Sequence, residues 1–228
     1  MAQFHFVEDY EKLVGDLIAT HPIDEAMAIA VGGKYELIGQ IELDMLKEAG
    51  LDDGMSVFDL GCGSGRLAFT IAKSGLDISY LGTDIVQALL DYARSKTPDS
   101  YRFICHRDLS IPAEDSSVDI ACAFSVFTHL LHHETYIYLE EMRRVLKPNG
   151  RIVFSFLEFG PPGQWAVFED TVLHQKRQTT PHLNTFIERN AIAAWASHLD
   201  LKVDRFIGGW EPVRNNVPLG QSVVVLRR

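Results

Sequence analysis

The sequence has few cysteines and no metal-type spacing between them. Only three occur in 228 residues, Cys62, Cys105 and Cys122. All lie in or beside apolar runs of strand length, and their number is odd. This pattern predicts buried free thiols in a reducing compartment, so we expect a cytoplasmic protein without a bound metal.

Long apolar runs and an excess of basic residues are also missing. No stretch approaches the roughly 20 apolar residues that cross a bilayer, and residues 1–30 lack the pattern of a signal peptide. Acidic residues outnumber Lys and Arg by 31 to 21, which gives a net charge of −10. This balance argues against a broad surface for nucleic acid or anionic lipid. We therefore expect neither nucleic acid nor a membrane as a partner.

Apolar runs of strand length alternate with segments of helical period over much of the chain. The link 208–219 between the last two runs is too short and irregular for a helical crossover, so that pair should be antiparallel. We predict an α/β fold, a doubly wound, mostly parallel sheet of about seven strands with one antiparallel strand and helices on both faces. The expected strands are residues 55–60, 78–82, 101–105, 118–124, 151–157, 201–207 and 222–226.

The two ends of this pattern differ from its middle. Residues 1–50 are expected to form an N-terminal helical cap, broken near His21-Pro22 and Gly32-Gly33, ahead of one compact domain over 51–228. Residues 158–184 form a long connection with a short helix near 167–175, which is typical of a substrate-side insertion. A capping box at 185–188 predicts a helix that runs to about residue 199.

The most informative stretch is a glycine-rich corner between the first strand and the next helix. Gly61, Gly63 and Gly65 follow Asp59, which ends the strand. Glycine accepts positive φ and lets a ligand approach the backbone, and a helix N-terminus offers N–H groups to it. We expect a small-molecule pocket at this corner.

Two ligand classes fit such a corner. A dinucleotide site requires glycine where this chain has Arg66, whereas Asp84, 19 residues after Gly65 at the end of the second strand, can accept both hydroxyls of a ribose. Asp108 ends the third strand and can accept from an adenine amino group. These acids all lie at carboxyl ends of strands, where open α/β sheets bind their ligands.

Together these motifs resemble the class I S-adenosylmethionine-dependent methyltransferases, a family with a Rossmann-like fold. The resemblance covers residues 35–157. The segments that carry it are residues 57–65, Asp84, 107–109, 117–130 and 138–150.

The resemblance implies S-adenosylmethionine as cofactor, S-adenosylhomocysteine as product and a defined set of cofactor-binding residues. Asp84 would hold the ribose, Phe124 would lie near the methionine amino group, and Tyr35 would be either a pocket wall or a packing aromatic. Asp59 would act indirectly by fixing the glycine loop. The full set is Tyr35, Asp59, Gly61, Cys62, Gly63, Gly65, Asp84, Ile85, Asp108, Leu109 and Phe124.

A hydroxyl acceptor also needs a base, and histidine is the commonest choice. His129 follows the fourth strand, where an acceptor would approach, so it is our catalytic candidate; the alternative is a packing or capping histidine. Further candidates on the substrate side are Phe127, Trp165, His174 and His182.

The acceptor is expected to be a small molecule, methylated at a hydroxyl or another small nucleophile. The family's enzymes for nucleic-acid bases carry Pro-Pro-aromatic after strand four, where this chain has Ser125-Val126-Phe127. Two alternatives remain open at this stage. One is an NAD-dependent oxidoreductase, and the other is a non-catalytic cofactor-binding or scaffolding protein on the same fold.

Overall fold

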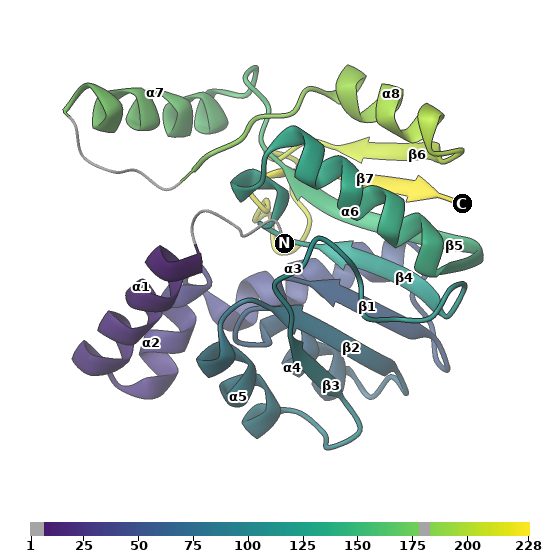
Figure 1. Cartoon of the computed structure of the whole chain (residues 1–228), viewed down its shortest axis with the longest axis horizontal. Coiled ribbons are helices and arrows are strands. Elements are labelled where there is room, and N and C mark those ends of the chain that lie inside the picture. Colours follow the sequence, from purple (N-terminus) through teal and green to yellow (C-terminus); the bar gives the residue numbers. More distant parts are fainter. Residues whose placement is uncertain (1–6, 178–182) are drawn as a thin grey trace. The chain divides into compact units, whose positions relative to one another are not determined.

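A computed structural model describes residues 7–177 and 183–228. Its sheet has seven strands in the order β3-β2-β1-β4-β5-β7-β6 (Figure 1). The chain divides into two compact units, Met1–Pro112 and Ala113–Arg228. The expected boundary at residue 50, between a cap and a single domain, stays a prediction. No helix of the described residues is long and apolar enough to cross a membrane.

The first unit contains three parallel strands, β1 (Ser56–Leu60), β2 (Ser79–Asp84) and β3 (Arg102–Cys105). Helices α4 (Arg66–Ser74) and α5 (Gln87–Lys96) form the crossovers between them. Four of the five residues of β1 are buried, as expected for a strand covered on both faces. These elements confirm the sequence prediction for this part of the chain.

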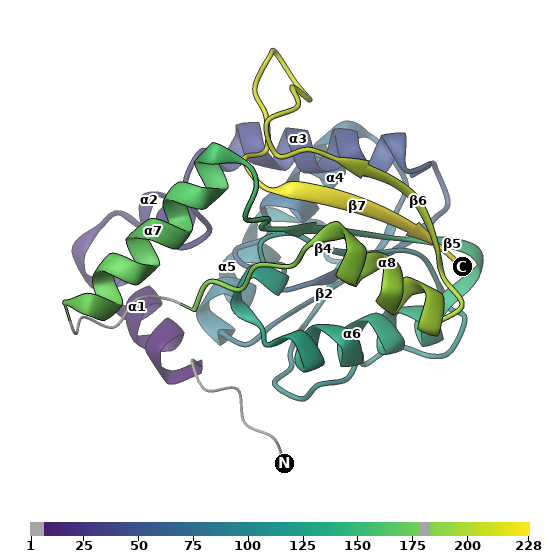
Figure 2. The same ribbon diagram turned by 90° about the horizontal axis from the view of Figure 1, so that it is seen from above.

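Three helices precede the first strand: α1 (Val7–Thr20), α2 (Ile23–Ala30) and α3 (Tyr35–Glu48). The chain breaks between them at the predicted places, because Pro22 caps α2 and the two glycines at 32 and 33 both have positive φ. Helices α1 and α2 lie side by side (Figures 1 and 2).

The second unit contains β4 (Val118–Ala123), β5 (Leu146–Phe156), β6 (Lys202–Ile207) and β7 (Ser222–Arg227). Strand β7 is antiparallel to both β5 and β6, whereas β4 and β5 are parallel. The reversed strand is therefore next to the edge strand β6, as predicted. Figure 2 shows the β6–β7 connection as a loop that extends beyond both strands.

The described residues of the second unit also form a short 3-10 helix, η1, and three α-helices. Helix α6 begins where Glu134 accepts a hydrogen bond from the N–H of Leu131 at 2.7 Å, and Arg143 and Arg144 lie in its last turn. Both features suit the helix dipole. The bounds are η1 (Phe127–His129), α6 (His132–Val145), α7 (Pro162–Lys176) and α8 (Arg189–His198).

Three predicted boundaries are wrong in this unit. Strand β5 begins at Leu146 instead of residue 151, because Leu146 already pairs with Val118 and the register then shifts before Ile120 pairs with Arg151. Most of the long connection 158–184 is helix α7, since the prolines at 161 and 162 occupy its N-cap and first position and no breaker follows Gly163.

The last predicted helix begins four residues later than expected. Thr185 does not open it: the N–H of Thr185 donates to the carbonyl of Thr128 at 2.7 Å, and Phe186 pairs with Leu157. These backbone bonds keep residues 185–187 extended, so Glu188 becomes the N-cap of α8. A long-range pairing has overridden a local capping signal.

Candidate cofactor and acceptor sites

The glycine corner of the first unit has the backbone geometry that its sequence predicts. Gly61, Gly63 and Gly65 have φ values of 64°, 55° and 81°, all in the left-handed region that only glycine adopts without strain. Gly65 is also the N-cap of α4, and its carbonyl begins the helix by accepting from the N–H of Phe69 at 2.8 Å. The three glycines therefore turn the chain sharply from β1 into α4.

Two of these glycines are also required by neighbouring side chains. A Cβ on Gly63 would lie 2.6 Å from Cγ1 of Val31, and one on Gly65 would lie 2.6 Å from Cβ of Ala93. Gly65 therefore lets α5 approach the corner. The sequence suggested close approach by a ligand, and the structure adds close approach by the chain itself.

Asp84 ends β2 beside this corner and is bonded to it. One carboxylate oxygen accepts the N–H of Gly63 at 2.9 Å, and the other accepts the N–H of Val86 at 3.0 Å. The side chain is buried. Burial raises the pKa of Asp84 above its usual value, and hydrogen bonds from the backbone of Val86, Gly63 and Ile85 oppose that rise.

These contacts are compatible with a nucleoside ligand. A carboxylate offers about four acceptor positions, so Asp84 has capacity for a ribose hydroxyl beyond its bonds to the backbone of Gly63, Ile85 and Val86. The N–H groups of Cys62 and Gly63 are both used within the protein, by the carbonyl of Thr83 and by Asp84. The loop therefore does not present these two N–H groups as an anion cradle, which fits a nucleoside better than a pyrophosphate.

Cys62 and Asp59 are packed against β2. The thiol of Cys62 lies where a Cβ on Gly82 would come within 2.7 Å, and burial raises the pKa of this thiol well above its ordinary value. Asp59 is buried and accepts a hydrogen bond from the hydroxyl of Tyr80. That Asp59 also holds the glycine loop stays a prediction.

The other predicted cofactor residues of this unit differ from one another in burial and in hydrogen-bond contacts. The hydroxyl of Tyr35 donates to the carbonyl of Ser64 at 2.8 Å, so this side chain fixes the position of the glycine loop. Ile85 is partly buried beside the N-terminal helices. Asp108 is exposed and Leu109 is partly buried in the loop after β3, and their contact with adenine stays a prediction.

An ion pair that the sequence pattern did not predict stabilises this corner. Arg66 donates through Nε and a terminal nitrogen to Oε1 of Glu42 on α3, at 2.9 and 2.5 Å, and through its other terminal nitrogen to the carbonyl of Val31 at 2.6 Å. Glu42 is only 1% exposed. In the sequence, Arg66 stands out only because it occupies the position of the third glycine of a dinucleotide site. The available signal was an acid at a position of α3 that the helical period assigns to the buried face.

In the second unit, the ring of His129 is hydrogen-bonded to a backbone carbonyl. Its Nδ1 lies 2.7 Å from the carbonyl of Leu183. Because a carbonyl only accepts, Nδ1 carries the proton, and Nε2 is then the basic atom of the neutral ring. Phe124 is buried just after β4, and Phe127 is completely buried with its ring edge-on to Phe154 at 4.9 Å.

The remaining substrate-side candidates lie on α7 or beyond it. Trp165 is 42% exposed and contacts Phe168 at a ring distance of 5.1 Å. His174 lies one turn from Asp170, with 3.5 Å between Nε2 and a carboxylate oxygen. His182 lies outside the described residues. Among those residues, no group of three His, Cys, Asp or Glu side chains could hold a metal ion.

Comparison with known proteins identifies the family. Residues 58–154, which include the glycine corner and Asp84, match the family described as "Methyltransferase domain". The fold as a whole is similar to that of solved methyltransferase structures. This chain is a class I S-adenosylmethionine-dependent methyltransferase. It is therefore an enzyme that uses S-adenosylmethionine, and neither the NAD-dependent oxidoreductase nor the scaffolding alternative is retained.

Individual relatives are distant. The ubiquinone biosynthesis O-methyltransferase of Hahella chejuensis is 27% identical over 82% of this chain and 80% of that protein. The biotin biosynthesis bifunctional protein BioHC of Cellvibrio japonicus is 29% identical, over 72% of this chain but only 30% of that protein. Magnesium protoporphyrin IX methyltransferase from Synechocystis PCC 6803, solved with bound S-adenosylhomocysteine, is 16% identical with a TM-score of 0.65, covering 98% of this chain and 96% of that one. At that identity the structural likeness shows the fold alone.

Proposed function

We propose that this methyltransferase transfers a methyl group to a hydroxyl of a small-molecule acceptor. The observation that carries the proposal is the hydrogen bond from His129 to the carbonyl of Leu183, which leaves Nε2 as a base. Similarity to proteins named ubiquinone biosynthesis O-methyltransferase supports an oxygen nucleophile.

We also propose that the glycine corner and Asp84 hold the cofactor. Asp84 accepts the ribose hydroxyls, Ile85 and Leu109 line the adenine, and Asp108 accepts from its amino group. The backbone of Gly61 and its neighbours lies against the methionine part, with Phe124 near the amino group. The bond between Asp84 and Gly63 supports this assignment, because it joins the ribose acid to the loop in a single rigid unit.

The chemistry asks little of the protein beyond alignment and removal of a proton. The bound cofactor supplies a sulfonium methyl group that is already electrophilic. The protein has to align the acceptor oxygen with that methyl group, exclude water and take up the hydroxyl proton. We assign the last step to Nε2 of His129, whose ring orientation is set by its bond to Leu183.

The apolar part of the acceptor is proposed to contact an aromatic cluster at the start of α7. The ring of Phe159 stacks on that of Phe186 at 4.8 Å, and Phe168 lies edge-on to both. Phe159 and Trp165 remain 40% and 42% exposed. Exposed rings on a well-packed base offer a flat apolar acceptor a large contact area at small entropic cost.

Incubation of the enzyme with a metabolite extract and isotopically labelled S-adenosylmethionine tests this proposal. We expect mass spectrometry to show a small molecule that gains one labelled methyl group on oxygen. The variant His129→Gln should lower kcat for that acceptor by about 100-fold or more, the range of general-base catalysis, without weakening S-adenosylhomocysteine binding. Labelling of nucleic acid instead of a metabolite, or full activity in His129→Gln, would contradict it.

A further inference from the structure

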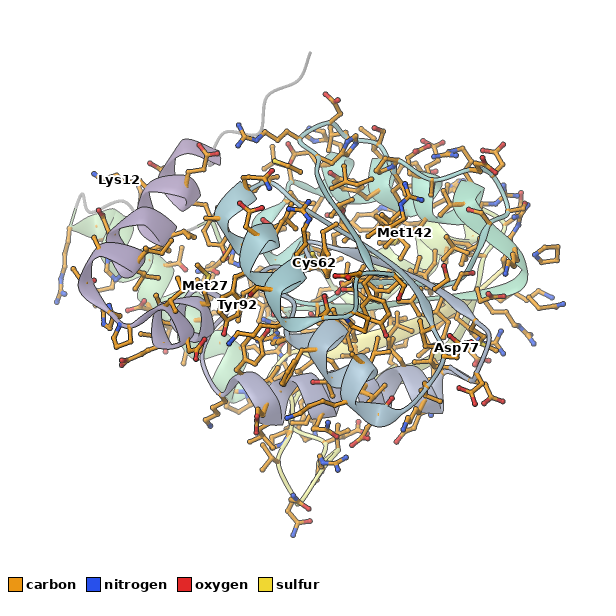
Figure 3. All side chains as sticks on the ribbon, turned by 90° about the horizontal axis from the view of Figure 1, so that it is seen from below. Lys12, Met27, Cys62, Asp77, Tyr92 and Met142 are labelled. Carbon is orange, nitrogen blue, oxygen red and sulfur yellow. The ribbon has the colours of Figure 1, made fainter. Side chains whose placement is uncertain are left out.

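The N-terminal helices α1 and α2 pack on the side of the first unit where the adenosine would lie. Val14 of α1 and Met27 of α2 form one buried cluster with Val86 and Leu89, which follow Asp84 in the chain. Figure 3 shows Met27 and Tyr92 close together, and Tyr92 belongs to the partly buried shell of this cluster. Ile85, the proposed adenine contact, belongs to the same shell.

Tyr10 of α1 contributes a hydroxyl group to this packing. Its hydroxyl donates to the carbonyl of Ala30 at 2.8 Å, which joins α1 to the end of α2. Burial raises the pKa of the Tyr10 hydroxyl, and the charge of Asp84 raises it further, so the phenol lies within electrostatic reach of that carboxylate. Nothing in the sequence pattern of α1 indicated this position.

An ion pair holds α1 against the segment that follows β3. Arg107 donates through Nε to the carbonyl of Ile85 at 3.1 Å, and its terminal nitrogen pairs with Glu11 of α1. Both side chains of the pair are about half exposed, at 47% and 41%. A second, solvent-exposed link joins α2 to α5, where Asp24 accepts from Tyr92 at 2.8 Å and from Lys96 at 2.9 Å.

We propose that α1 is part of the cofactor site: Tyr10 closes the site beside Ile85, and the Glu11–Arg107 pair holds the helix closed between one cofactor exchange and the next. This inference rests on the proposed placement of the nucleoside at Asp84 and Ile85. The same guanidinium contacts the residue after the ribose acid and the closing helix. Arg107 therefore links the closing helix directly to the segment that follows Asp84.

A helix that closes over a pocket gates entry and exit together. In this scheme α1 is mostly closed both with and without ligand, so breaking the ion pair raises the open fraction by the same factor in both states. Association and dissociation then accelerate by the same factor, and the dissociation constant stays the same. A residue that only contacts the ligand would change dissociation and affinity instead.

The variant Glu11→Gln tests whether the Glu11–Arg107 ion pair holds α1 closed. The measured quantities are the association and dissociation rates of tritium-labelled S-adenosylhomocysteine. We expect both rates to rise roughly two- to fivefold, the range for an exposed ion pair, with Kd changed less than twofold. High salt should accelerate exchange in the unmodified protein and have little effect on Glu11→Gln. Glu36→Gln is the control, since it removes another surface ion pair, the more exposed one with Lys73, that involves neither α1 nor α2.

Two further variants test whether the Tyr10 ring closes the cofactor site. Tyr10→Ala should weaken S-adenosylhomocysteine binding by about tenfold, while Tyr10→Phe, which keeps the ring, should stay within about threefold. Unchanged exchange rates in Glu11→Gln, or unchanged affinity in Tyr10→Ala, would overturn the inference. Failure of the proposed function is distinguishable from these outcomes, because Asp84→Asn would then bind S-adenosylhomocysteine as tightly as the unmodified protein.

Discussion

At the scale of single residues, the glycine corner combines two requirements at Gly63. Its φ of 55° penalises any other residue, and its missing Cβ leaves room for Val31. The φ preference could be predicted from the alternating glycines. The contact with Val31 could not, because Val31 is 32 residues away in the chain and reaches the loop only through the turn after α2.

Gly63→Ala should therefore destabilise the fold by about 2–5 kcal/mol, the sum of left-handed strain and overpacking against a stiff β-branched side chain. Gly54→Ala is the matched control, since Gly54 has φ 75° and no atom within 4 Å of its added Cβ. It should lose only about 1–2 kcal/mol. Urea unfolding measures the free energy of unfolding of both variants. Equal decreases would show that the Val31 side chain can move aside without destabilising the protein.

Asp84 is a second residue whose burial has a measurable consequence. Its pKa is raised by burial in the native state, so the folded protein binds the proton more tightly than the unfolded chain does. The resulting stability is fully present below the unfolded pKa of about 3.9 and is lost as pH rises through the raised native value.

The unmodified protein should thus lose stability relative to Asp84→Asn as pH increases from about 4 to 7. Urea unfolding of both proteins across that range measures the difference. If the unmodified protein instead gains stability relative to Asp84→Asn as pH rises, the backbone hydrogen bonds lower the Asp84 pKa by more than burial raises it.

At the scale of elements, the contact of α3 with α4 depends on a close approach and one buried ion pair. A Cβ on Gly39 of α3 would lie 2.8 Å from the carbonyl oxygen of Arg66, so the helices touch through backbone there. Arg66 and Glu42 then pair with side chains only 11% and 2% exposed. Breaking such a pair leaves a buried charge without its partner.

Arg66→Ala should destabilise the protein by about 3–5 kcal/mol. The double variant Arg66→Met with Glu42→Leu should recover most of that loss, because no charge is then buried. Lys73→Ala, which removes the exposed pair with Glu36, is the control and should change stability by less than about 0.5 kcal/mol. A double variant as unstable as Arg66→Ala would rule out the buried charge as the cause.

Prediction of elements succeeded where local signals decide and failed where distant pairing does. Alternating strands and helices with glycine and proline stops placed α3 to α6 within a few residues. The capping signal at Thr185 was misleading because Phe186 pairs with Leu157. The insertion is predicted as a long connection with only a short helix near residues 167–175, yet the longer helix α7 (Pro162–Lys176) forms. Its buried residue, Gln164, anchors it through bonds to Glu158, Gly220 and Ser222.

At the scale of the whole molecule, the reaction class followed from a few residues, while the acceptor did not. All of the predicted cofactor residues except Tyr35 and Phe124 lie between Val57 and Leu109, so their spacing is visible in the sequence. The acceptor side combines segments far apart in the chain, such as His129 with Leu183. No local pattern encodes such a pairing, which is why Tyr10 and Arg66 were also missed.

The most direct test of the account is the stabilisation of the protein by S-adenosylhomocysteine. At about one hundred times Kd, this ligand should raise the unfolding free energy of the unmodified protein by about 2.7 kcal/mol, whereas NAD should not. At the same concentration Asp84→Asn should gain less than about 1 kcal/mol, because the ribose has lost its charged acceptor. Equal stabilisation of the two proteins would contradict the placement of the cofactor at the glycine corner.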